Sequence, residues 1–199
     1  MSDRITLTFP DGSTREFDRG VTGNEVASSI SEGLARMAVA IGVDGATRDL
    51  SRAIEENSSI QIFTMRDAEG QATYWHSSAH LMAEALESLY PGVKFGIGPA
   101  IEKGFYYDVD LGDRTIGTED LGAIEKKMAE LAKQNSNYVR KEVSKADAIA
   151  YFTEKQDEYK LELLEDLEDG TITFYSQGEF TDLCRGPHVP STGRIKFVK

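Results

Sequence analysis

The chain has 199 residues, 40% of them hydrophobic, and a formal net charge of −12. This length suits one large domain or two small ones, and so acidic a balance argues against a general nucleic-acid binder, which needs a basic surface. A single cysteine excludes an internal disulfide, the N-terminus lacks the pattern of a signal peptide, and no apolar run approaches the ~20 residues that span a bilayer. We therefore expect a cytoplasmic protein that binds neither membranes nor DNA.

Residues 1–64 have the pattern of a small mixed domain. Alternating apolar residues around an Asp-Gly turn predict a hairpin over 5–17, and a threonine cap precedes a short helix over 24–30. The continuous apolar run 38–43 predicts a buried strand, and alternation returns in 59–63. This order of hairpin, helix and further strands predicts a compact β-grasp without catalytic residues.

A polar stretch that ends in Gly70 follows residue 64, and we place a domain boundary at its start. Residues 65–199 then predict a larger α+β domain. Periodicity and capping signals predict helices over 71–90, from 118 onwards and over 157–167, and strands over 104–110, 138–143, 171–175 and 195–198. The predicted buried stripe of the first helix is Trp75, Ala79, Met82, Leu86 and Leu89, and that of the second is Leu121, Ile124, Met128 and Leu131.

All three histidines and the only cysteine lie in two short motifs. His76 and His80 are one helical turn apart, and Cys184 and His188 flank a Gly-Pro turn. Imidazole and thiolate titrate near neutrality, bind metals and move protons, so this concentration predicts one composite site. Two uses remain open: a Cys-His₃ zinc site, or a metal-free hydrolytic site in which histidines orient water and Asp182 fixes a tautomer.

Four motifs in the second predicted domain point to a family. His-Ser-Ser-Ala-His, Gly-Ile-Gly-Pro, Gly-Phe-Tyr-Tyr-Asp-Val-Asp and Asp-Leu-Cys-Arg-Gly-Pro-His-Val-Pro together resemble the N-terminal region of bacterial threonyl-tRNA synthetases. The resemblance implies a ubiquitin-like TGS domain over 1–64. It also implies an editing domain of the threonyl and alanyl type over 65–199, cut slightly before its C-terminal end.

The resemblance further implies hydrolysis of mischarged seryl-tRNA(Thr). The positions that match the family's editing pocket are His76, His80, Lys160, Asp182, Cys184 and His188, with Tyr107 and Gly98 nearby.

By the same resemblance, these positions have different roles. We expect His76 and Lys160 to position or activate water and to stabilise the oxyanion, and Asp182 to hold the serine amine. Tyr107 and Gly98 would contact the terminal adenosine, and the other three positions would shape the pocket.

The resemblance also carries expectations about cofactors and partners. Editing should need no cofactor, although zinc could bind His76, His80, Cys184 and His188, because the alanyl relatives use a matching motif for metal. ATP and a tightly held zinc would belong to the family's aminoacylation domain, whose class II motifs we do not find in this chain. The expected partner is the acceptor end of tRNA(Thr); the full-length family enzyme would be a homodimer and this chain a monomer.

Two other functions remain open on the sequence. One is a non-catalytic module that binds the tRNA acceptor arm through the basic cluster Lys126, Lys127, Lys133, Arg140, Lys141 and Lys145. The other is a structural zinc module.

Overall fold

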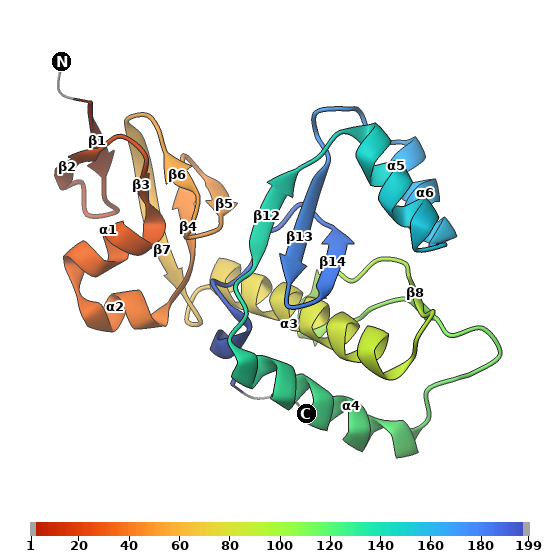
Figure 1. Cartoon of the computed structure of the whole chain (residues 1–199). Helices are drawn as coiled ribbons and strands as arrows, with labels where there is room; N and C mark the ends of the chain where they lie inside the picture. The colour runs from red at the N-terminus through yellow and green to blue at the C-terminus, as the bar shows by residue number, and fades with distance from the viewer. Residues whose placement is uncertain (1–2, 197–199) are drawn as a thin grey trace. The chain divides into compact units, whose positions relative to one another are not determined.

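The computed structural model describes residues 3–196 (Figure 1). Within that range the chain divides into two compact units. The first extends to Tyr74 and includes Pro187–Pro190, and the second extends from Trp75 to Gly186 and includes the residues from Ser191 on. No helix of the described residues is both long and apolar enough to cross a membrane.

The first unit is built on a five-stranded sheet in the order β2-β1-β7-β4-β5. These strands are β2 (Thr14–Asp18), β1 (Arg4–Thr8), β7 (Ser58–Thr64), β4 (Ala38–Val43) and β5 (Ala46–Arg48). β1 and β7 are parallel, whereas the other neighbouring pairs are antiparallel. The helices α1 (Gly23–Ile30) and α2 (Glu32–Met37) and the paired strands β3 (Val21–Thr22) and β6 (Ala53–Ile54) complete it. The predicted β-grasp is confirmed.

Local sequence explains the main elements of this unit. All six residues of β4 are buried, which is the reason for its unbroken apolar run. Helix α1 begins with a capping box: Thr22 N–H donates to the Glu25 carboxylate at 2.8 Å, and Thr22 Oγ1 accepts from Glu25 N–H. Val26 and Ala27 of α1 then join the buried core of the sheet. The six-residue α2 was missed because it is too short to show a helical period.

The second unit is α+β, as predicted. Its long helices are α3 (Ala68–Leu89), which begins in the first unit, and α4 (Thr118–Gln134). An antiparallel sheet has the order β12 (Val139–Glu142), β13 (Thr173–Gln177) and β14 (Phe180–Leu183). Helices α5 (Lys145–Glu154) and α6 (Glu158–Glu165) share a buried core with this sheet (Figure 1). The shorter elements are β8 (Lys94–Phe95), β9 (Ala100–Ile101), β10 (Gly104–Phe105), β11 (Val109–Asp110) and the 3₁₀ helix η1 (Thr192–Arg194).

Three predictions for this unit need correction. The expected strand over 104–110 is interrupted, because its first end pairs with β9 in a tight hairpin and its last end pairs with β8. The expected strand over 195–198 does not include Ile195 or Lys196, and its other residues lie outside the described ones. In α4, Leu121 is 49% exposed, whereas Ile124, Met128 and Leu131 are buried as expected.

Candidate functional site

Helix α3 carries the first half of the predicted site. His76 and His80 lie on the same side, with ring centroids 5.2 Å apart and ring planes at 87°. His80 is buried and His76 is half-buried. The helix is more enclosed than its predicted apolar stripe implied, because Ser77, Ser78 and Glu84 are buried as well. Of the two histidines, His76 is therefore the one within reach of a bound molecule.

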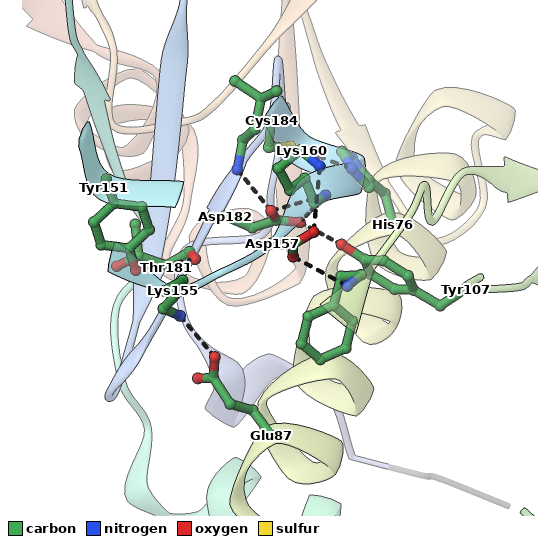
Figure 2. Close-up of polar contacts among 12 residues, drawn as sticks. His76, Glu87, Tyr107, Tyr151, Lys155, Asp157, Lys160, Thr181, Asp182 and Cys184 are labelled. Atoms are coloured by element: carbon green, nitrogen blue, oxygen red, sulfur yellow. Dashed lines mark hydrogen bonds and ion pairs between the residues drawn. The ribbon is translucent and has the colours of Figure 1, made fainter. Parts of the chain in front are cut away.

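Cys184 follows β14 and meets His76. Its Sγ lies 3.4 Å from His76 Nε2 (Figure 2). The same sulfur accepts a hydrogen bond from Gly186 N–H at 3.2 Å. The backbone of Cys184 is held by Thr173, whose carbonyl accepts from Cys184 N–H at 3.0 Å. Gly186 has a φ of +72°, and a Cβ there would lie 2.2 Å from the Tyr175 hydroxyl, so only glycine fits this turn.

His188, the fourth member of the predicted quartet, belongs to Pro187–Pro190 and so to the first compact unit. It is buried, and its backbone N–H donates to Asp49 Oδ1 at 2.7 Å. Asp49 was not predicted from the sequence. Nothing in the sequence distinguishes it from a solvated aspartate, because its burial follows only from the fold.

Lys160 and Asp182 form a buried ion pair beside the histidines. Lys160 Nζ lies 2.8 Å from Asp182 Oδ1 and 2.9 Å from Oδ2, and both side chains are 3% exposed. Asp182 also accepts from its neighbour Leu183 N–H at 2.8 Å and from the Tyr107 hydroxyl. Figure 2 shows this carboxylate between the lysine and the tyrosine. Three residues predicted from distant parts of the chain are thus in direct contact.

Gly98 is in contact with the same tyrosine. A Cβ on Gly98 would lie 2.4 Å from Tyr107 Cδ2, so the ring rests on the glycine backbone. Tyr107 also packs against Phe95, with centroids 5.4 Å apart, and faces His80 at 6.5 Å. The absence of a side chain at Gly98 thus leaves the space that the Tyr107 ring occupies.

The electrostatic environment fixes two protonation states. Burial, followed by the nearby His76 and Lys160 charges, holds the pKa of His80 well below its ordinary value, so the ring stays neutral near pH 7. Burial and the neighbouring Asp182 charge raise the pKa of Tyr107 well above its ordinary value. The phenol therefore keeps its proton and donates it in the hydrogen bond to Asp182.

Sequence reasoning missed two buried carboxyl groups in this unit. Asp157 caps α6 and is 5% exposed, and its place before a helical run was the only signal. Glu84 of α3 is 6% exposed, and burial raises its pKa to about 7. Nothing in the sequence distinguishes Glu84 from a solvated helix glutamate.

The residues of this unit partly fit a zinc ion. The candidate ligand atoms of His76, His80 and Cys184 all lie within 4.8 Å of one another. Tetrahedral zinc requires nitrogen and sulfur ligands roughly 3.3–3.6 Å apart, which the 3.4 Å between Cys184 and His76 already meets. Zinc held there would polarise a bound water or carbonyl.

Two family profiles match parts of the chain. The profile of the TGS domain matches residues 4–64. The profile described as the threonyl and alanyl tRNA synthetase second additional domain matches residues 172–199.

Curated relatives match almost the entire chain. A protein named threonine–tRNA ligase from Cytophaga hutchinsonii is 64% identical over 195 residues, which is 98% of this chain and 30% of that protein. Proteins of the same name from Porphyromonas gingivalis and Phocaeicola vulgatus are 56% and 55% identical, with the same coverage. The chain thus spans about a third of the length of these relatives. It corresponds to the N-terminal part of threonine–tRNA ligases and carries a TGS domain followed by an editing-type domain of the threonyl and alanyl tRNA synthetases.

Proposed function

We propose that this chain performs post-transfer editing by hydrolysing seryl-tRNA(Thr). The observation that carries the proposal is the buried pair of Lys160 and Asp182 next to His76 and Cys184. A buried ion pair adds little net stability, because the loss of hydration offsets the attraction between its charges. Such a pair beside a half-buried histidine is therefore better explained by chemistry than by folding.

Such a site is needed because serine and threonine are difficult to distinguish by binding alone. The two amino acids differ by one methyl group, and one methylene-sized group changes binding by only about 1–3 kcal/mol. A second site can reject the larger, correct product sterically and hydrolyse the smaller, wrong one. His80, Cys184 and Phe180 are buried and His80 packs against Phe180, so these side chains could form the rigid walls that exclusion by size requires.

The hydrolysis needs only groups already in the second unit. A water oxygen adds to the ester carbonyl while His76 takes its proton, and the ribose oxygen leaves with that proton, releasing serine and tRNA. Lys160 is the nearby positive charge that would stabilise the oxyanion. Neutral His80 would accept or donate a hydrogen bond without adding charge.

Substrate binding would use the remaining predicted residues. Tyr107, whose ring rests on Gly98, would offer an aromatic face to the terminal adenosine. Asp182 would hold the serine ammonium, which must then share this carboxylate with Lys160 and Tyr107. His188 is expected to shape the pocket.

The proposal also covers partners and location. tRNA(Thr) would bind through its acceptor end, and ATP-dependent ligation and a homodimeric state are proposed for the longer proteins only. We expect this chain to be a cytoplasmic monomer, and size-exclusion chromatography tests the oligomeric state.

A purely RNA-binding role is less favoured. Lys145 Nζ donates to the carbonyls of Glu165 and Leu167, and Arg140 pairs with Glu142, so two members of the basic cluster already have partners.

The deciding experiment is a paired deacylation assay. The chain is incubated with seryl-tRNA(Thr) and threonyl-tRNA(Thr), alongside Lys160→Met and His76→Ala. We expect hydrolysis of the seryl substrate alone and its loss in both variants. Equal hydrolysis of the two substrates, or none, would refute the editing role. If His76→Ala left all activity unchanged while tRNA still bound, the binding-module alternative would be favoured.

A further inference from the structure

The start of α6 is held in place by its own backbone. Helix α5 ends at Glu154, and Asp157 N–H donates to the carbonyl of Phe152 at 3.0 Å. Gln156 adopts a left-handed φ of 56°, which turns the chain sharply between the two helices. Asp157 therefore occupies one defined position, immediately before the first turn of α6.

The Asp157 carboxylate joins two elements that are far apart in the sequence. Its Oδ1 accepts from Lys160 N–H at 3.2 Å, which caps α6, and its Oδ2 accepts from Phe95 N–H of β8 at 3.1 Å. The side chain is buried, and Figure 2 shows it next to Lys160. An N-cap needs only the first of these bonds. The second ties the helix to the strand whose Phe95 ring contacts Tyr107.

Lys160 needs such support because of where it lies. It is in the first turn of α6, where the helix dipole disfavours a positive charge. Its ammonium is nonetheless buried against Asp182 and lies 5.7 Å from the centre of the Tyr107 ring. The negative charge of Asp157 offsets the dipole at this end of the helix. Its bond to Phe95 N–H sets the distance between the helix and β8.

We propose that Asp157 is the positioning residue for Lys160: by bridging Lys160 N–H and Phe95 N–H, it directs the ammonium to Asp182 and Tyr107. This inference rests on the proposed editing function for its kinetic consequence, but its structural consequence is independent of it. Asp157 and Asp182 line a common cavity of about 170 Å³, so a shorter side chain at 157 would leave space that solvent can fill.

Two variants separate positioning from capping. Asp157→Ser can still cap α6 but is too short to reach Phe95 N–H. Asp157→Asn keeps one oxygen acceptor, but its amide NH₂ group then faces the second backbone N–H and cannot accept from it. In both we expect a folded chain whose kcat for seryl-tRNA(Thr) falls by about tenfold to a hundredfold at nearly constant KM, since small misplacements of catalytic groups are costly. We also expect the slowly exchanging ¹⁵N signal of the Lys160 ammonium to disappear. Ser144→Ala, which removes the cap of α5, is the matched control and should change neither readout.

The outcomes are distinguishable. If Asp157→Ser keeps the wild-type kcat and the ammonium signal, Asp157 is only a helix cap and the inference is wrong. If that variant does not fold, Asp157→Asn carries the same two readouts. If the wild-type chain hydrolyses no seryl-tRNA(Thr), the proposed function fails, and the ammonium signal alone decides the role of Asp157.

Discussion

Lys160 Nζ lies 2.8 Å from Asp182 Oδ1, although each side chain is only 3% exposed. Removing one partner leaves an uncompensated buried charge, so Lys160→Met and Asp182→Asn should each lower the free energy of unfolding by about 3–5 kcal/mol. The double variant loses both charges and should recover much of this stability. Urea unfolding followed by Trp75 fluorescence measures all three.

The Lys94–Glu158 pair is the matched control for that cycle. Its side chains are 30% and 67% exposed at a similar distance of 2.7 Å, so Lys94→Met should cost less than about 1 kcal/mol. Single variants of the buried pair that cost no more than Lys94→Met would contradict the prediction.

Gly98→Ala should displace the Tyr107 ring, because the new methyl group would lie 2.4 Å from its Cδ2. We expect a loss of about 1–3 kcal/mol in unfolding free energy, as for other overpacked sites. Since the ring would leave the adenosine position, KM for seryl-tRNA(Thr) should rise. In Gly122→Ala of α4 the added Cβ meets no described atom within 4 Å, and the variant should be stabilised by about 0.5–1 kcal/mol. A Gly98→Ala variant as stable as Gly122→Ala would contradict the packing argument.

Features encoded locally could be predicted from the sequence. The first hairpin, the capped α1 and the buried β4 each follow from a local pattern, the longest being the hairpin from Arg4 to Asp18. The His76, His80 and Cys184 site was accessible for a different reason: the chain has so few histidines and cysteines that their placement was informative by itself.

What could not be predicted depends on distant partners. Asp157 is bonded to Phe95, 62 residues away, and no local pattern records that contact. Glu84 resembles a surface glutamate until the burial of α3 is known. The segment 104–110 alternates like a strand, yet it changes pairing partner between Phe105 and Val109.

Metal removal tests the remaining use of the His76, His80 and Cys184 group. Because the proposed hydrolysis uses His76 and Lys160 without a metal, we expect dialysis against a chelator to leave hydrolysis of seryl-tRNA(Thr) and thermal stability unchanged. Elemental analysis of the dialysed protein supplies the zinc content. Cys184→Ser, which removes the thiolate that zinc prefers, is the control for adventitious binding. One equivalent of zinc retained with activity, and both lost together on chelation, would instead establish a zinc site.

Glu84 should make stability fall as the pH rises. Burial, with the nearby Glu87 and Glu179 charges, raises its pKa from 4.5 to about 7, whereas hydrogen bonds from Glu179 N–H and Gln177 act in the opposite direction. The folded state therefore binds a proton more tightly than the unfolded state, and the resulting stabilisation is complete below pH 4.5 and lost as the pH passes 7.

Glu84→Gln mimics the protonated acid and removes this titration. Relative to the variant, the wild type should lose about 1–2 kcal/mol of unfolding free energy between pH 5 and 8, once screening by nearby solvent is allowed for. Glu179→Gln removes one of the repelling charges and should move the wild-type transition to lower pH. Gln177 Nε2 also donates to the backbone carbonyl of His80 at 3.0 Å. Ionised Glu84 would therefore compete with this carbonyl for the Gln177 amide group. Parallel pH profiles of wild type and Glu84→Gln in urea unfolding would show that the carboxyl group does not titrate in this range.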